Sequence, residues 1–152
     1  MKKEYIEITN DLMFPEGPIA MPDGSIILVE IARGTLTQVH KNGSKDIIAE
    51  LGGGPNGAAI GPDGCVYVCN NGGFEWHNID GLLIPGGQGD NYSGGRIEKV
   101  DLKTGSIETE SIFKAKNINY VECPVMGGPV QAEEGILGGI VGASDKNFKI
   151  AE

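Results

Sequence analysis

Apolar and polar positions along the chain follow one succession twice, at an offset of 40 residues. Each copy opens with a Pro-x-Gly segment and continues to a Pro-Asp-Gly turn. It then enters a run of β-branched, aromatic and aliphatic residues, at 25–30 and again at 65–70. Such runs are typical of buried strands. Repetition at a fixed period of this size predicts a repeat architecture.

Each copy continues with a segment that alternates apolar and polar residues, which predicts a half-exposed strand. These segments are 34–39 and 95–100. Each is followed by a hairpin turn and a last strand. In the first copy the turn is Asn42-Gly43 and the strand is 46–49, and in the second copy the turn is Thr104-Gly105 and the strand is 107–112. Each repeat is therefore predicted to be a four-stranded antiparallel meander, which is the blade of a β-propeller.

Composition is consistent with this interpretation and limits the partners. The 25 glycines and 8 prolines among 152 residues suit many short strands joined by tight turns. The net charge of -9 argues against nucleic acid or an anionic membrane as a partner. Neither a membrane-spanning apolar run nor an apolar signal core is present, so we expect a cytoplasmic protein. The three cysteines form no disulfide framework, and Cys65 and Cys69 are expected in the core.

The repeated positions Glu16 and Asn56 are the first candidates for chemistry. The first strand of every propeller blade lines the central channel, so equivalent positions converge near one face of the ring. A carboxylate and an amide oxygen are hard ligands that suit Ca²⁺, Mg²⁺ or Mn²⁺ and are tolerated by Zn²⁺. The alternative is that both segments are ordinary turns, with Glu16 exposed and Asn56 bonded to its own backbone.

Over about residues 5–113, the chain resembles the opening blades of the gluconolactonase/regucalcin (senescence marker protein) family, and four segments carry this resemblance. They are 14–18 with Asp23-Gly24, the strand 26–29, 53–59 and 94–101. The resemblance implies an all-β fold, a partial six-bladed β-propeller with two four-stranded blades over residues 1–114. It also implies hydrolysis of a small-molecule sugar lactone or ester with the help of a divalent metal ion. Ca²⁺ is the expected ion, and Zn²⁺, Mg²⁺ and Mn²⁺ are the alternatives. In that family the glutamate matching Glu16 is a metal ligand, and asparagines at the position of Asn56 bind either metal or substrate.

Two blades are fewer than a closed ring requires, and the later metal ligands of the family have no counterpart here. Since affinity rises with ligand number and charge, we expect a truncated lactonase that is impaired or inactive as an isolated chain. The alternative is a non-catalytic binding or assembly module that completes a propeller with another chain. Open blade edges would also allow a homo-oligomer.

The segment between the second and third strands is much longer in the second repeat, at 71–94, and is expected to be a loop. In an antiparallel meander this segment lies on the face that carries Glu16 and Asn56. It contains Trp76 and His77, which we expect to contact substrate together with Asn56. The alternatives are a mobile glycine-rich flap and a contact to another subunit. No catalytic residue is assigned.

Residues 115–152 do not continue the repeat. The run Pro124-Val125-Met126-Gly127-Gly128 and the expected strand 139–143 resemble, over about 117–152, part of a β-hydroxyacid dehydrogenase of the 3-hydroxyisobutyrate type. This implies a short α/β tail with a helix capped by Ser144 or Asp145, and an NAD-dependent dehydrogenase remnant as a further alternative function. Met126 replaces the substrate-contacting serine of that family. The family's glycine-rich turn and catalytic lysine have no counterpart, which suggests fused gene fragments; a divergent partial blade is the alternative.

Overall fold

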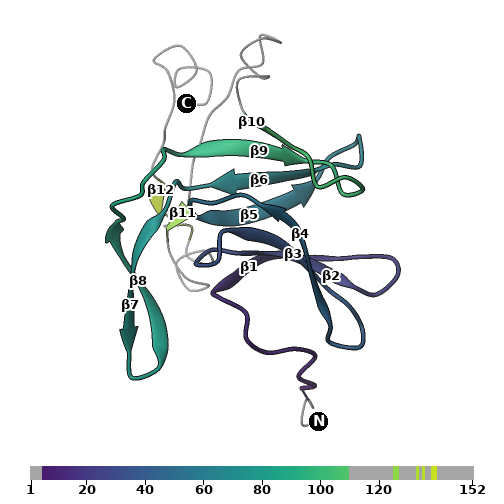
Figure 1. The fold of residues 1–152 in the computed structure, drawn as a ribbon, viewed down its shortest axis with the longest axis horizontal. Coiled ribbons are helices and arrows are strands. Elements are labelled where there is room, and N and C mark those ends of the chain that lie inside the picture. Colours follow the sequence, from purple (N-terminus) through teal and green to yellow (C-terminus); the bar gives the residue numbers. More distant parts are fainter. Residues whose placement is uncertain (1–4, 110–124, 127–132, 134, 136–137, 140–152) are drawn as a thin grey trace. The chain divides into compact units, whose positions relative to one another are not determined.

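The computed structural model describes residues 5–109, 125–126, 133, 135 and 138–139. The chain divides into two compact units, residues 1–110 and 111–152, and each is described here by itself. The elements of both units are short strands (Figure 1).

The first unit begins with an antiparallel four-stranded sheet in which neighbouring strands follow one another along the chain (Figure 1). Its strands are β1 (Pro15–Ala20), β2 (Ile26–Glu30), β3 (Thr35–Val39) and β4 (Lys45–Glu50). These are the strands of the first predicted meander, and glycine follows Asp23 in the turn after β1, Arg33 in the turn after β2 and Asn42 in the turn after β3.

The second sheet repeats the arrangement with strand order β10-β9-β6-β5. Its strands are β5 (Pro55–Ile60), β6 (Val66–Asn70), β9 (Arg96–Val100) and β10 (Ile107–Thr109). The predicted all-β fold of two four-stranded, blade-like antiparallel sheets is confirmed. The part of the last predicted strand beyond Thr109 lies outside the described residues.

The two Pro-Asp-Gly turns are built by the same side-chain contact. The Asp23 carboxylate accepts a hydrogen bond from the Ser25 backbone N–H at 2.9 Å. In the second copy the Asp63 carboxylate accepts from the Cys65 backbone N–H at 3.2 Å. A carboxylate that bonds the backbone two residues later stabilises the turn locally, so both copies fix the start of their second strand in one way.

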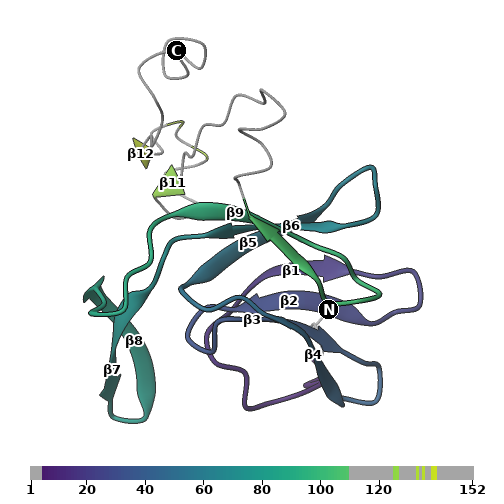
Figure 2. The same ribbon diagram turned by 45° about the horizontal axis from the view of Figure 1, so that its top comes forward.

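Figure 2 shows the two sheets of the first unit next to each other, and residues of both form its hydrophobic core. Ile27 and Val29 of β2 and Val66 and Val68 of β6 are all at most 2% exposed. Because strand residues alternate between faces, Tyr67 and Cys69 of β6 point to the opposite face from Val66 and Val68. The expectation that Cys65 and Cys69 are core residues is therefore wrong: Cys69 is exposed and Cys65 is only partly buried.

The first strands of the two sheets approach each other closely at Gly17. A Cβ atom placed on Gly17 would lie 2.8 Å from the backbone nitrogen of Ala58 on β5, and the φ of Gly17 is +55°. Both the space and the left-handed backbone favour glycine at this position. The Pro-Glu-Gly motif therefore has a packing role that does not depend on any ligand.

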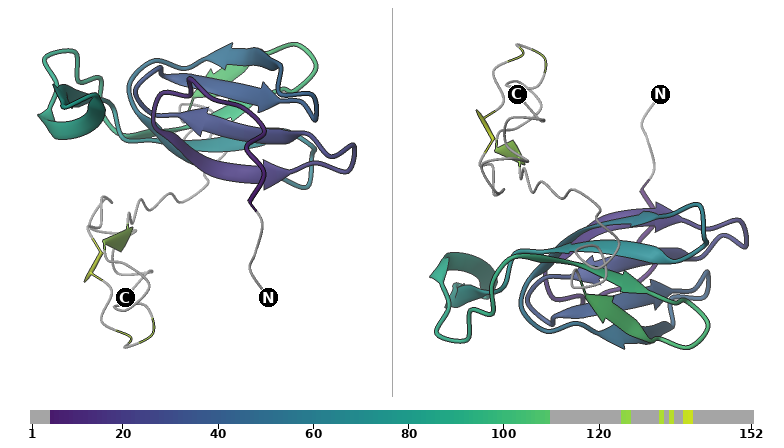
Figure 3. Two further views of the ribbon diagram at one scale, coloured as in Figure 1. Left: turned by 90° about the horizontal axis from the view of Figure 1, so that it is seen from below. Right: turned by 90° about the horizontal axis from the view of Figure 1, so that it is seen from above.

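The segment predicted as a loop folds instead into a β-hairpin that projects from one end of the two sheets (Figure 3). Its strands are β7 (Phe74–Ile79) and β8 (Leu82–Gln88). Between them, Asp80 and Gly81 have φ values of 53° and 82°. Positive φ at both central residues matches the twist of the flanking strands, so Asp-Gly closes the hairpin.

The second unit contains a short antiparallel pair, β11 (Val125–Met126) and β12 (Gly138–Gly139). The expected helix cap at Ser144 or Asp145 and most of the expected strand 139–143 lie outside the described residues. No helix within the described ranges has the length and apolar character that crossing a bilayer requires.

Candidate functional site

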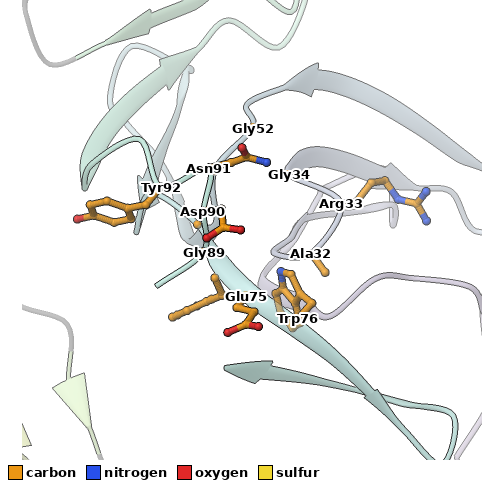
Figure 4. Close-up of a pocket in the computed structure, with 13 residues that line it drawn as sticks. Ala32, Arg33, Gly34, Gly52, Glu75, Trp76, Gly89, Asp90, Asn91 and Tyr92 are labelled. Atoms are coloured by element: carbon orange, nitrogen blue, oxygen red, sulfur yellow. The ribbon is translucent and has the colours of Figure 1, made fainter. Parts of the chain in front are cut away.

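A cavity of about 410 Å³ lies in the first unit, at the end of the sheets from which the hairpin projects (Figure 4). Its walls come from the turn between β2 and β3, the glycine loop between β4 and β5, and both ends of the hairpin insertion, at 73–76 and 89–92. The volume falls within the usual range of small-molecule sites, roughly 300–1,000 Å³.

The hairpin is anchored to the sheets by aromatic packing and backbone hydrogen bonds. The Trp76 ring lies 5.2 Å from the Phe14 ring, which precedes β1, and 6.1 Å from the Phe74 ring, edge to face. The Asn71 backbone N–H donates to the Gly54 carbonyl at 2.9 Å. Trp76 is thus held as one wall of the cavity, because aromatic pairs in these arrangements attract each other beyond their buried area.

Two acidic side chains, those of Glu75 and Asp90, line the cavity. Figure 4 shows the carboxylates of Glu75 and Asp90 near the Trp76 ring, while Tyr92 points away. The nearest basic partner of Glu75 is His77, at 3.8 Å between Nε2 and Oε2. Within the described part of the chain, no hydrogen bond or ion pair engages the Asp90 side chain. These carboxylates are available to a ligand.

Arg33 also lines the cavity, but its guanidinium is already engaged elsewhere. Its Nε donates to Glu30 Oε2 at 2.9 Å, and its Nη2 donates to the Asp11 carbonyl at 2.9 Å. Burial raises the pKa of Glu30, but this effect is outweighed by hydrogen bonds from the Met13 N–H, Arg33 and Thr37, which leave its pKa below the ordinary value. Glu30 therefore stays ionised and neutralises Arg33.

The glycine loop under the cavity is fixed by Asn70 at the end of β6, which is 0% exposed. Its side-chain oxygen accepts from the Gly54 N–H at 2.8 Å and the Gly72 N–H at 3.0 Å. Its side-chain nitrogen donates to the Gly52 carbonyl and to Glu98 Oε2, both at 2.9 Å. One buried amide therefore connects the glycine loop, the start of the insertion and β9, because each of these backbone groups needs a partner once buried.

A partly buried ion pair between Arg96 and Glu98 supports the same region. Arg96 Nε donates to Glu98 Oε1 at 2.8 Å, and Arg96 Nη2 donates to the Leu51 carbonyl at 2.9 Å. Arg96 also donates to the Ser93 hydroxyl at 2.8 Å, at the far end of the insertion. Both ends of the hairpin insertion are thus bonded into this network around Asn70 and Glu98.

The predicted site residues are spread over this end of the first unit. Glu16 is exposed on β1, where its carboxylate accepts only a long bond, 3.4 Å, from the Gly17 N–H within the described structure. Asn56 is exposed on β5, and His77 is exposed on β7. Trp76 lines the cavity, whereas Asn56 and His77 are not among its lining residues. The role of Asn56, Trp76 and His77 in substrate binding stays a prediction.

The prediction of a divalent-metal cofactor is wrong, while the individual roles of Glu16 and Asn56 stay predictions. Within the described residues, no group of three or more His, Cys, Asp or Glu side chains is placed to hold a metal ion. A single carboxylate and an amide on two exposed strands leave most of the coordination sphere of Ca²⁺ to water, so affinity would be low. Neither Ca²⁺ nor Zn²⁺, Mg²⁺ or Mn²⁺ has a convergent set of ligands there.

Residues 52–57 have the spacing Gly-x-Gly-x-x-Gly of a nucleotide-binding turn, although no counterpart of that turn was expected in this chain. The structure places them between β4 and β5, so a strand follows where the motif requires a helix. The Gly52 N–H donates to the Gly34 carbonyl at 2.9 Å, and the Gly54 N–H donates to Asn70. These donors are not free for phosphate oxygens.

A protein-family model described as the NAD binding domain of 6-phosphogluconate dehydrogenase matches residues 102–152, about a third of the chain. A search of curated proteins finds no match. The predicted membership of the gluconolactonase/regucalcin family, with its lactone substrate, is wrong, because the family match is to an NAD-binding domain over residues 102–152, which begin within the second sheet and include β10. The match supports a small-molecule ligand and points to NAD(H) in place of a divalent metal. Over residues 102–152 the chain is therefore similar to the NAD binding domain of 6-phosphogluconate dehydrogenase.

Proposed function

We propose that residues 102–152 supply an NAD(H)-binding segment of the β-hydroxyacid dehydrogenase type. The observation that carries this proposal is the family match over these residues. Within these residues, the run Pro124-Val125-Met126-Gly127-Gly128 carries the resemblance to β-hydroxyacid dehydrogenases. The described strands of this unit also support it, since β11 and β12 pair antiparallel with Val125 opposite Gly139 and Met126 opposite Gly138. A strand ending before two glycines and followed by a second strand is the order that the resemblance implies.

We expect this segment to bind the nucleotide weakly. In complete domains of this class, backbone N–H groups at a helix N-terminus hold the pyrophosphate. The glycines at 52–57 do not offer that arrangement, because a strand follows them. A hydrogen bond to a charged group contributes about 1.5–3 kcal/mol, so losing two of them weakens binding by roughly a hundredfold or more. Starting from an affinity on the order of 10 μM, the expected Kd is about 1 mM.

We also expect little hydride transfer. Met126 stands where the resembling family has a serine that contacts substrate, and a thioether has no hydroxyl to donate. A substrate hydroxyl or carboxylate would lose one positioning bond. We therefore expect this segment to bind a nicotinamide nucleotide and to catalyse hydride transfer only slowly.

Saturation-transfer difference NMR on the full chain tests the proposal, because the method detects millimolar ligands. NADH should give saturable signals from its nicotinamide and adenine protons, and ribose 5-phosphate should give none. Equal signals from both ligands, or none from NADH at about 10 mM, would overturn the proposal.

A pair of variants extends this test. Met126→Ser restores the hydroxyl and should strengthen the binding of a 3-hydroxy acid in the presence of NADH by about tenfold, the effect of one hydrogen bond. Met13→Ser, which makes the same change in the first unit, should have no effect. A gain with Met13→Ser, or none with Met126→Ser, would contradict the assigned role of position 126.

A further inference from the structure

We propose that the cavity beside the β7–β8 hairpin binds a small organic cation, with Glu75 and Asp90 holding its charge and Trp76 its apolar body. This inference concerns the first unit alone. It does not rest on NAD(H) binding by residues 102–152.

The charge of the cavity selects a cation. Glu75 and Asp90 line it, and Arg33, the one basic residue among the described lining residues, is neutralised by Glu30 at 2.9 Å. In Figure 4 the Arg33 guanidinium points away from the two carboxylates. The cavity therefore carries an excess of free negative charge, and the net charge of -9 of the whole chain adds to the attraction of cations.

The aromatic wall favours an organic cation above a bare metal ion. Trp76 is the best side chain for cation–π contact, and Phe14 and Phe74 hold its ring in place. The cavity of about 410 Å³ is also far larger than one metal ion requires. A substituted ammonium ion has both a charge for the carboxylates and methyl or methylene groups for the indole.

Phosphate-bearing ligands are disfavoured in the same place. The N–H groups of Gly52 and Gly54 in the adjoining loop are bonded to Gly34 and Asn70 and cannot turn to an anion. Two carboxylates at the opening would repel phosphate oxygens as well. The cavity thus favours a cation, whereas a dinucleotide site binds the anionic pyrophosphate.

The chain contains one tryptophan, so its fluorescence reports on this cavity directly. The full chain is titrated with choline and, separately, with 3,3-dimethyl-1-butanol, which has the same shape without the charge. Choline should change the Trp76 emission saturably, with a Kd at least tenfold lower than that of the neutral alcohol. Equal affinities for the two probes, or no saturable change with choline, would overturn the proposal.

Charge-matched variants separate the cavity from the general acidity of the protein. Glu75→Gln with Asp90→Asn should weaken choline binding about tenfold, as expected for two solvent-exposed ion pairs. Asp46→Asn with Glu108→Gln removes two exposed carboxylates that do not line the cavity and should leave the choline Kd unchanged. Equal loss in both double variants would show attraction by net charge alone and refute the site. Should the cavity variant fail to fold, the comparison of choline with the neutral alcohol on the unaltered protein still decides.

Discussion

Replacement of Asn70 by alanine should destabilise the first unit more than the loss of an ordinary side chain. The Asn70 side chain is fully buried and makes four hydrogen bonds, to the Gly52 carbonyl, the Gly54 and Gly72 N–H groups and the Glu98 carboxylate. Asn70→Ala leaves all four partners without this amide inside the protein.

The magnitude follows from the kinds of bond that are lost. Three bonds to neutral backbone groups contribute about 1 kcal/mol each, and the bond to the Glu98 carboxylate about 1.5–3 kcal/mol. The sum is about 4–6 kcal/mol, against a total stability of about 5–15 kcal/mol for a typical domain. We therefore expect Asn70→Ala to bring the first unit close to its unfolding threshold at room temperature.

Urea unfolding followed by Trp76 fluorescence measures this change in the first unit. With a slope of about 2 kcal/mol per molar urea, the midpoint should fall by about 2–3 M. Asn42→Ala is the matched control, because Asn42 is exposed and its side-chain oxygen accepts from the Ser44 N–H and hydroxyl in a surface turn. That variant should lose about 1 kcal/mol or less. Similar losses in the two variants would refute the assigned role of the buried network.

Two further predictions concern acid stability and the contact between β1 and β5. The hydrogen bond from Lys99 is the main cause that lowers the pKa of Asp63 from 3.8 to about 2, so its stabilising effect is present above about pH 4 and is lost as the pH falls through about 2. In Asp63→Asn the melting temperature should change less between pH 4 and pH 2 than in the unaltered protein, and an unchanged acid profile would contradict the reasoning. Gly17→Ala places a Cβ 2.8 Å from the Ala58 nitrogen at a φ of +55° and should cost about 2–4 kcal/mol in urea unfolding. Gly87→Ala, where a Cβ meets no atom within 4 Å, should be close to neutral, and equal effects would show that the contact is not tight.

The strands of both sheets could be predicted because their signals are local. The Pro-Asp-Gly turns place Asp23 and Asp63 two residues before the N–H groups that they bind, within the reach of a single turn. Alternation on β6 then directs Val66 and Val68 inward, as the pattern indicates. Such signals define a meander, but they are shared by many unrelated proteins built from four-stranded sheets. They therefore gave the fold correctly and the family incorrectly.

The hairpin was missed although its signal is present in the sequence. Asp80-Gly81 lies between Ile79 and Leu82, which is the pattern of a two-residue hairpin turn. The many glycines around it, at 86, 87 and 89 among others, favour an irregular loop when composition alone is considered. The cavity depends on this hairpin, so it could not be predicted without it.

The metal prediction failed for a reason that sequence cannot reveal. Convergence of ligands depends on how the two sheets are placed, and the structure leaves Glu16 exposed on β1 and Asn56 exposed on β5. The Asn70–Glu98 network was equally hidden, since its partners are 28 residues apart and belong to different strands. Which side chains meet across neighbouring strands depends on the register of those strands, and a short sequence motif does not determine that register.

The two sheets share a backbone plan but not an arrangement of buried polar groups. In the first sheet, the carboxylate of Glu30 at the end of β2 accepts a hydrogen bond from the hydroxyl of Thr37 on β3. In the second sheet, Asn70 and Glu98 occupy the positions that correspond to Glu30 and Thr37. There the side-chain amide of Asn70 donates a hydrogen bond to the carboxylate of Glu98. A single exchange of Asn70 for glutamate would set two carboxylates against each other. The two buried positions are therefore coupled, and a chimera that places the β2 sequence in the second sheet should be more stable when Glu98 is replaced by threonine as well.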